Sequence, residues 1–544
     1  MIILFSKYLF CACIFIVVCG NTIRDNELYR LDIIHYNDFH DRFEETSVAY
    51  PLCKSNDTSC IGGFARLYHE IQELHQEKPD ALVLNAGDTF QGTYWYSLLK
   101  WNISQKFMNM LPNDAHALGN HEFDDGVEGL VPYIKSLNAP VVAANIQLSN
   151  NSQLEGLYKP HIIIERKGRK IGIIGLITTK TRMNLHLQFI SKSEKVTFLD
   201  PVPVVKEQAK LLADQGVDII MVLSHCGLDV DQNIAKKVGE NIDIIVGGHT
   251  HSLLWNGISP PGEQVVGPYP VIVESDAKPG HKVLIVTASA FSKCIGNISL
   301  YFDQQGDMVD FDGAPIYLNS SIPEDSEIKA LLQPHADQLH QLVNEKIGSL
   351  TGDLSTKTCR SQECAIGNLI ADAFWSATNK TQPTERPIIA YLHSNNIRTS
   401  LLKGVITRGS IINIMPFTNK IVTFTIQGRY LLDAFSTCVR KPWVLKPYAG
   451  PHTPMISGLK LTINTTSAQV LEAIVTSGST EVPLDPDQDY QVTTMDFLAY
   501  VGLEFKKYGR DLKVVGKDIA VIENYIRTLS PITPYLDNRL TLVS

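Results

Sequence analysis

Five short polar segments, each placed just after a run of apolar residues, constrain this chain more than any other feature. The apolar runs are typical of buried strands, and four of them cover residues 31–34, 81–84, 218–223 and 242–246. The polar segments are Asp38-Phe39-His40, Gly87-Asp88, Gly119-Asn120-His121-Glu122, Ser224-His225-Cys226-Gly227 and Gly248-His249-Thr250-His251. In layered α/β sheets, ligands gather where loops leave the carboxyl ends of strands. These segments are therefore expected to converge on one rim.

The residue types in these segments suit a centre with two divalent metal ions. Such a pair, about 3.5–4 Å apart, neutralises a phosphate ester and activates the attacking water. Asp88 is the candidate for the carboxylate that bridges both ions. Imidazoles suit zinc, manganese or iron, and the amide oxygen of Asn120 adds a hard donor without charge. Each segment alone fits loop residues that only form hydrogen bonds, but five in this order favour a metal centre.

The order of the segments, Asp-x-His, Gly-Asp, Gly-Asn-His-Glu, x-His-x-Gly and Gly-His-x-His, resembles the calcineurin-like metallophosphoesterases. Residues 87–92 (Gly-Asp-Thr-Phe-Gln-Gly), 119–124 (Gly-Asn-His-Glu-Phe-Asp) and 359–369 (Cys-Arg-Ser-Gln-Glu-Cys-Ala-Ile-Gly-Asn-Leu) are similar to segments of the 5'-nucleotidase family. The resemblance implies an α/β fold: an N-terminal four-layer α/β/β/α metallophosphoesterase domain, a linker helix, and a C-terminal α+β substrate-binding domain.

The same resemblance implies roles for individual residues. The ligands implied for one ion are Asp38, His40, Asp88 and His251, and those for the other are Asp88, Asn120, His225 and His249. His121, oriented by Asp124, is then the histidine that faces the scissile phosphate without binding metal. Independently of the family resemblance, an imidazolium held by a carboxylate can stabilise developing charge or protonate a leaving oxygen. The alternative is that His121 is itself a ligand, but the other residues already fill two coordination spheres.

A length of 544 residues predicts two or three domains, because a single core does not grow this large. Residues 1–20 are predicted to be a cleaved secretory signal, with an uncleaved membrane anchor as the alternative. Residues 25–317 are the predicted metallophosphoesterase domain, 318–347 a linker helix, and 348–544 the C-terminal nucleotide-binding domain. The linker helix, whose alternative is an ordinary core helix, starts after Pro323-Glu324-Asp325. Its apolar residues at helical spacing are Ile328, Leu331, Leu332, Leu339, Leu342 and Val343.

Further signals agree with secretion. Glycosylation sequons occur at Asn56, Asn102, Asn150, Asn297, Asn319, Asn379 and Asn464. Two close cysteine pairs, Cys53/Cys60 and Cys359/Cys364, indicate small-loop disulfides, whereas spacing does not pair Cys226, Cys294 and Cys438. The net charge of −9 argues against a nucleic acid partner, which would need a basic face. The C-terminal residues lack the hydrophobic tail of a lipid-anchor signal, so no membrane anchor is expected.

The C-terminal half is expected to recognise the nucleotide. The resemblance implies that Arg360 and Arg398 contact the substrate phosphates, a task suited to the planar guanidinium group. It also implies that Phe417 and Phe497 sandwich the base, since aromatic stacking accepts any base.

Two positions in this half depart from the family pattern. His393-Ser394-Asn395-Asn396 stands where the family has an asparagine followed by glycines, and His393 is kept as a substrate-binding candidate. Leu503 stands where the family has an aspartate that binds the ribose hydroxyls. Because leucine accepts no hydrogen bond, a broadened pocket or weaker affinity is expected.

Together these features predict a secreted two-metal nucleotide phosphohydrolase, similar to the salivary apyrases of blood-feeding arthropods. Its expected reaction is hydrolysis of extracellular ATP and ADP to AMP and phosphate. The ligand types favour zinc or manganese, with calcium or magnesium as alternatives for apyrase activity. One alternative function is a 5'-nucleotidase acting on AMP. Another is a catalytically weak member that binds nucleotides or a platelet receptor, although the chain contains no Arg-Gly-Asp tripeptide.

Overall fold

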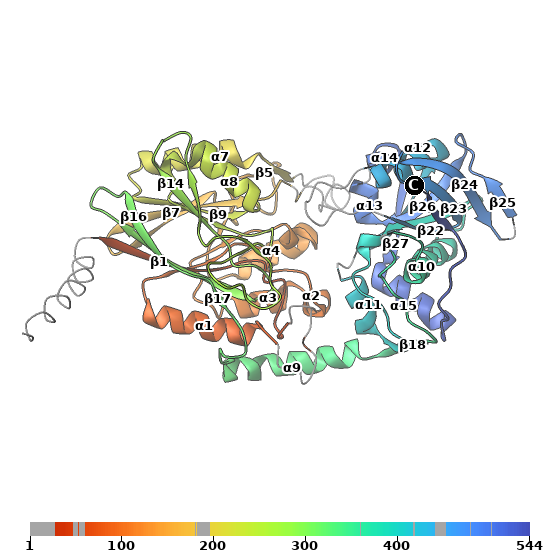
Figure 1. Ribbon diagram of the computed structural model, residues 1–544, viewed down its shortest axis with the longest axis horizontal. Coiled ribbons are helices and arrows are strands. Elements are labelled where there is room, and N and C mark those ends of the chain that lie inside the picture. The colour runs from red at the N-terminus through yellow and green to blue at the C-terminus, as the bar shows by residue number, and fades with distance from the viewer. Residues whose placement is uncertain are drawn as a thin grey trace, which may run out of the picture.

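The computed structural model consists of two α/β halves joined by one long helix, which runs beneath the N-terminal half and ends at the edge of the C-terminal half (Figure 1). It describes residues 28–46, 53, 60–179, 181, 196–359, 361–416, 419–440, 453–478, 480–501 and 503–543. The predicted signal segment, residues 1–20, lies outside the described residues. Within the part of the chain that is described, no helix combines the length and the apolar character needed to cross a membrane.

The N-terminal half contains two large sheets. The first has the order β16-β15-β1-β2-β3-β4 with β17 beside β15, and the second has the order β13-β14-β10-β9-β7-β6. Strands of the first are β1 (Tyr29–Tyr36), β2 (Leu82–Asn85), β3 (Ala115–Ala117), β4 (Val141–Val142), β15 (Cys294–Phe302), β16 (Met308–Gly313) and β17 (Ile316–Tyr317). Strands of the second are β6 (His161–Arg166), β7 (Arg169–Ile177), β9 (Ile219–His225), β10 (Ile244–Gly247), β13 (Val271–Glu274) and β14 (Lys282–Val286). Strands β1 to β4 are parallel, as are β7, β9, β10 and β14, so each set ends at one edge.

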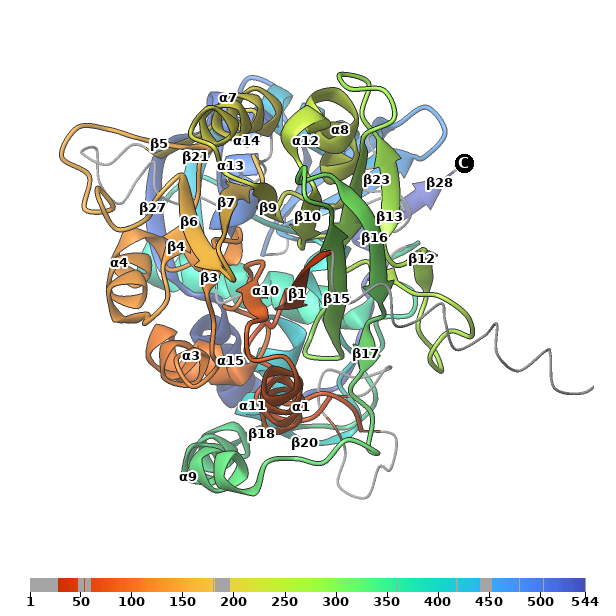
Figure 2. The ribbon, with the colours of Figure 1, turned by 90° about the vertical axis from the view of Figure 1, so that its left-hand side faces the viewer.

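Helices cover the outer face of each sheet and complete four layers, which Figure 2 shows from the side of this half. The helices are α1 (Phe64–Glu77), α2 (Tyr94–Leu99), α3 (Trp101–Met108), α4 (Gly126–Ser136), α7 (Pro201–Asp214) and α8 (Leu228–Val238). Alternate residues of β1 show the division, since Ile33 belongs to the core between the sheets and Ile34 to the core around Phe64 of α1. This is the α/β/β/α arrangement predicted for the N-terminal domain.

Smaller elements complete this half. Two short sheets pair β5 (Ile146–Leu148) with β8 (Val196–Phe198) and β11 (Leu253–Leu254) with β12 (Val265–Gly267). The short helices η1 (His121–Phe123) and η2 (Gly239–Asn241) follow β3 and α8. Of these, η1 bears on the site, because it begins directly after Asn120.

The C-terminal half is built on a five-stranded sheet of order β22-β19-β26-β21-β27 and a four-stranded sheet of order β25-β24-β23-β28. A third, two-stranded sheet pairs β18 (Lys346–Leu350) with β20 (Gly404–Thr407). The strands of the two larger sheets are β19 (Ile388–His393), β21 (Lys420–Gln427), β22 (Pro454–Ser457), β23 (Leu459–Asn464), β24 (Gln469–Ser477), β25 (Thr480–Pro483), β26 (Asp489–Met495), β27 (Arg510–Lys517) and β28 (Leu540–Val543). The helical elements are α10 (Ala365–Thr381), η3 (Ser394–Asn396), α11 (Arg408–Ile414), α12 (Gly428–Arg440), α13 (Asp496–Val501), α14 (Leu503–Tyr508) and α15 (Asp518–Leu529).

The joining helix α9 (Ser326–Val343) lies within residues 318–347, where the sequence predicts a linker helix. Its N-cap is Asp325, whose carboxylate accepts a hydrogen bond from the backbone N–H of Ile328 (2.8 Å). The buried face consists of Ile328, Leu332, Ala336, Leu339 and Val343. Leu331 and Leu342, expected on that face, are 43% and 36% exposed, because the helix packs along a narrower stripe than its apolar residues span.

Candidate metal centre and nucleotide site

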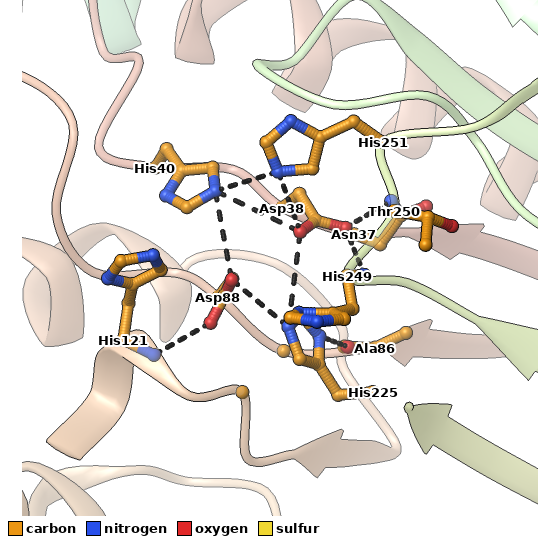
Figure 3. Close-up of polar contacts among 12 residues, drawn as sticks. Asn37, Asp38, His40, Ala86, Asp88, His121, His225, His249, Thr250 and His251 are labelled. Atoms are coloured by element: carbon orange, nitrogen blue, oxygen red, sulfur yellow. Dashed lines mark hydrogen bonds and ion pairs between the residues drawn. The ribbon is translucent and has the colours of Figure 1, made fainter. Parts of the chain in front are cut away.

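The five polar segments lie at the carboxyl ends of β1, β2, β3, β9 and β10, with Ser224 and His225 still part of β9, and their loops are tied to one another at the rim of the two sheets. The backbone N–H of Asp38 donates to the carbonyl oxygen of Gly87 (2.9 Å), and that of His40 donates to the carbonyl oxygen of Asp88 (3.0 Å). The N–H of His249 donates to Oδ2 of Asp38 (2.9 Å). Residues from both sheets are thus brought together, as Figure 3 shows.

Most of the predicted ligands occupy a strained backbone conformation. The positive φ angles are 50° at Asp38, 52° at His40, 54° at Asp88, 76° at His249 and 51° at His251. Residues with side chains seldom adopt this left-handed region, and such strain persists where the surrounding structure fixes it, commonly at functional sites.

The side chains form two adjacent groups, each with its ligand atoms within 4.8 Å of one another. The first contains Asp38, His40 and His251, and the second contains Asp88, His225 and His249. Oδ1 of Asp38 lies 3.1 Å from Nε2 of His251, and Oδ2 of Asp88 lies 3.0 Å from Nε2 of His225. The same Asp88 oxygen is 3.8 Å from Nε2 of His40. Asp88 therefore lies between the groups, where a bridging ligand has to be.

Several buried polar atoms at this point have no hydrogen-bond partner. They are Oδ1 of Asp38, Oδ1 of Asn120 and Nε2 of His225, and the first and last of these are in ion-pair contact only with other candidate ligands. An unsatisfied buried polar group costs about 1–3 kcal/mol, so a cluster of them calls for a ligand. The carboxylate, amide and imidazole donors fit two divalent cations.

Two of the histidine rings, those of His40 and His225, are held so that Nε2 faces the centre. Nδ1 of His40 donates to the carbonyl oxygen of Gln91 (2.8 Å), and Nδ1 of His225 donates to that of Ala86 (2.7 Å). Such outer contacts fix the tautomer of metal-binding histidines. Burial lowers the pKa of His40 to about 3, which keeps its ring neutral. Burial also lowers the pKa of His225, but the carboxylates of Asp88 and Asp38 raise it more, to about 9, so the centre favours positive charge.

His121 and Asp124 form a contact beside Asp88. Nδ1 of His121 donates to Oδ2 of Asp124 (2.6 Å), and the backbone N–H of His121 donates to Oδ1 of Asp88 (2.9 Å). Burial lowers the pKa of His121, but the carboxylates of Asp124 and Asp88 outweigh it and raise the pKa to about 10. The ring is therefore an imidazolium near neutral pH, at the edge of the candidate metal centre.

Three residues that support the centre were not predicted from the sequence. Nδ2 of Asn37 donates to Oδ2 of Asp38 (2.6 Å) and to the carbonyl oxygen of Ser289 (2.6 Å). The ring of Phe291 packs against both His40 and His251, with centroids 5.4 and 4.9 Å away. Glu122, which the sequence shows only as part of the Gly-Asn-His-Glu motif, accepts hydrogen bonds from the loops that carry Asp88 and Asn120. For Asn37, the sequence offered one signal of a supporting role, namely its position next to Asp38.

Fewer of the predicted nucleotide-binding residues are described. The backbone N–H of Arg398 donates to the carbonyl oxygen of Ile414 (3.0 Å), and its side chain is exposed. Arg360 and Phe417 lie outside the described residues, and so do the side chains of Phe497 and Leu503.

His393 is part of a hydrogen-bonded turn. Its backbone N–H donates to Oδ1 of Asn396 (3.1 Å), and its ring accepts from the backbone N–H of Asn396, which closes a capping box around η3. Nε2 of His393 also contacts the hydroxyl of the buried Tyr391. The imidazole therefore has two partners within the protein.

Both predicted disulfides are present, Cys53–Cys60 and Cys359–Cys364. Cys226 and Cys294 are buried free thiols, and burial raises the pKa of each above the range of a reactive thiolate. The side chain of Cys438 lies outside the described residues.

The chain matches known families over both halves. Residues 31–253 match the calcineurin-like phosphoesterase family, and residues 346–510 match the 5'-nucleotidase C-terminal domain. An apyrase of Tabanus yao is 40% identical over 95% of each chain, and the 5'-nucleotidase of Homo sapiens is 33% identical over 94% of this chain and 91% of its own. The solved structure of the 5'-nucleotidase precursor of Thermus thermophilus is 29% identical, covers 95% of this chain and 99% of its own, and superposes with a TM-score of 0.75.

The similarity to the apyrase and to the 5'-nucleotidases extends over nearly the whole length of the chain, and the two family models match one half each. The protein belongs to the 5'-nucleotidase family, with a calcineurin-like phosphoesterase domain followed by the 5'-nucleotidase C-terminal domain. The predicted fold class and the predicted enzyme class, a hydrolase of phosphoric ester or anhydride bonds, are confirmed.

Proposed function

We propose that the protein is a secreted, two-metal, apyrase-like enzyme that removes terminal phosphates from extracellular ATP and ADP. The observation that carries the proposal is the arrangement at the rim: two ligand groups meet at Asp88, and His121 and Asp124 lie beside them. Relatives that are similar over nearly the full chain, from Tabanus yao and Aedes aegypti, are named apyrase.

In this proposal one ion is held by Asp38, His40, Asp88 and His251, and the other by Asp88, Asn120, His225 and His249. Zinc or manganese suits these donors, and calcium or magnesium remains an alternative for the apyrase reaction. When bound, the two ions supply Lewis acidity and a water of lowered pKa. Asp88, whose carboxylate lies between the two groups, would be the ligand shared by both ions.

His121 acts on the phosphate without binding metal. Its Nδ1–H is held by Asp124, which leaves Nε2 with a proton to donate, and its raised pKa keeps the ring charged. A held imidazolium can stabilise charge on the transferred phosphoryl group or protonate the leaving oxygen. Asp124 acts through His121, because its carboxylate fixes both the ring orientation and the charge.

The C-terminal half supplies specificity. Arg360 and Arg398 are proposed to bind the substrate phosphates, and Phe417 and Phe497 to sandwich the base. The turn that contains His393 ends next to Ile397 and Arg398, so it helps to place that arginine. The presence of Leu503, which accepts no hydrogen bond, favours weak discrimination at the ribose.

Two features that are typical of extracellular proteins, disulfides and glycosylation sequons, support secretion. Two short-loop disulfides are present, as is typical of oxidising surroundings. Four sequon asparagines are exposed and accessible to glycan attachment, namely Asn102, Asn150, Asn319 and Asn379. A salivary enzyme of this kind would oppose haemostasis by removing ADP.

A second candidate reaction is hydrolysis of AMP, because relatives named 5'-nucleotidase, such as the human protein, are nearly as similar. Phosphate release from ATP, ADP and AMP, each with zinc, manganese, calcium or magnesium added, separates the two. The proposal expects ATP and ADP to be converted to AMP, with AMP then persisting. Adenosine as the main product would instead establish the 5'-nucleotidase reaction. Tight nucleotide or platelet-receptor binding with no turnover would indicate a binding protein.

A further inference from the structure

Glu122 is a buried carboxylate that serves no role in the proposed reaction. It lies in η1 (His121–Phe123), between His121 and Phe123, and its side chain is almost fully enclosed, with the residue 1% exposed. Its oxygens accept four hydrogen bonds from backbone N–H groups. These donors are Asp88 (3.0 Å), Thr89 (2.7 Å), Phe90 (3.1 Å) and Gly119 (2.6 Å).

The four donors come from two different loops. Asp88, Thr89 and Phe90 follow β2, whereas Gly119 follows β3 and directly precedes the candidate ligand Asn120. Oε1 accepts from the N–H groups of Thr89 and Phe90, which lie on one loop. Oε2 accepts from the N–H groups of Asp88 and Gly119, which lie on different loops. A single carboxylate therefore links the loop of the bridging ligand to the loop of the amide ligand.

The contact between the two loops is close. A Cβ added at Gly119 would lie 2.1 Å from Oδ1 of Asp88, so only glycine fits. The same Asp88 oxygen accepts the N–H of His121 (2.9 Å). The spacing of Asp88, Asn120 and His121 thus depends on how closely these loops approach.

An ionised carboxylate has about four acceptor positions and no donor, so four N–H groups match its full capacity. This leaves Glu122 no lone pair for a metal ion. We propose that Glu122 is a positioning residue, which sets the spacing of Asp88 and Asn120 and hence the affinity for the ion held by Asn120, His225 and His249. The inference rests on the ligand set of the proposed function.

The test is metal binding by the folded, metal-free protein, measured by calorimetric titration with Mn²⁺ and by elemental analysis after dialysis. In Glu122→Gln the side chain keeps its shape, but an NH₂ group faces two backbone N–H donors. We expect the ion held by Asn120, His225 and His249 to bind about 10–100-fold more weakly, as is usual when a partner of a metal ligand is lost, and the other ion, which shares only Asp88, to be weakened less. The control is Glu128→Gln, the same chemical change at an exposed position of α4, which should bind both ions like the parent.

Parental affinity for both ions in Glu122→Gln would overturn the inference. If that variant does not fold, Glu122→Asp carries the test, because it retains the charge but is too short to reach both loops. It too should weaken binding of the ion held by Asn120 more than binding of the other ion, and parental affinity for both ions would again overturn the inference. A parent that does not bind two ions would instead refute the ligand set of the proposed function. The two failures are therefore distinguishable.

Discussion

In the N-terminal half, Asp38, Asn120 and His225 each bury a polar atom that makes no hydrogen bond and whose short contacts, where it has any, are with other candidate ligands. In the C-terminal half, the imidazole of His393 has Tyr391 on one side and the backbone of Asn396 on the other. Both kinds of residue were predicted as site residues from local sequence. The first group leaves polar atoms for a ligand from outside, whereas the ring of His393 already has partners within the protein.

The difference separates residues that bind a ligand from residues that shape a loop. Buried polar atoms without hydrogen bonds cost free energy, so a cluster of them is retained where a bound ion compensates the cost. For His393, whose ring has partners within the protein, we propose that it orders its turn and affects the substrate through its neighbour Arg398. Binding of metal and recognition of the nucleoside should therefore respond separately to mutation.

The largest effect is expected for Asp88→Ala. Loss of the bridging carboxylate removes a ligand from both ions, so phosphate release from ADP should fall by more than about 100-fold, beyond the usual cost of disturbing a partner of a ligand. Metal content should fall with it. Asp312→Ala, an exposed acid on β16, is the control. Turnover near the parental value with metals supplied would rule out the two-metal assignment.

His121→Ala should lower kcat by about 10²–10⁴-fold, the usual contribution of a positioned acid or base. Because the ring is assigned to the transition state, elemental analysis should still find close to two ions per chain. His161→Ala, in which the lost ring contacts only Gln208 among the described hydrogen bonds, should behave like the parent. Metal loss in His121→Ala would make His121 a ligand.

A smaller effect, and one that depends on pH, is expected for Asp124→Asn. The carboxylate raises the pKa of His121, and the protonated ring is the active form, so activity should persist up to alkaline pH in the parent. Removing the negative charge lowers that pKa, and the alkaline limb of kcat should shift to lower pH. A profile that is lowered at all pH values without a shift would show that Asp124 acts only by orienting the ring.

The smallest effect concerns the ribose. If Leu503 leaves the hydroxyls without an acceptor, kcat/KM for ADP and 2'-deoxy-ADP should differ by less than about tenfold, whereas sites built around a hydroxyl discriminate by about 10⁴–10⁵. Leu503→Asp should gain part of this preference while retaining its metal. Strong rejection of the deoxy substrate by the parent would mean that another residue, such as Asn395 or Asn396, has taken over the contact.

The sequence was most informative where chemistry is local. Asp38 and His40, or His249 and His251, appear as short patterns after apolar runs, and the cysteine pairs are close enough for spacing to join them. Glu122 could not be assigned in this way, because its four donors are adjacent only once β2 and β3 pair in the sheet. Leu331 and Leu342 fit the period of a helix, but the width of the packed stripe depends on the partner surface.

The central claim is that two ions bind at this rim and share Asp88. Anomalous scattering from crystals of the protein loaded with Mn²⁺ tests it most directly. The expected result is two peaks about 3.5–4 Å apart, one next to Asp38, His40 and His251 and the other next to Asn120, His225 and His249, with Asp88 between them. A single peak, or a peak coordinated by His121, would contradict the claim.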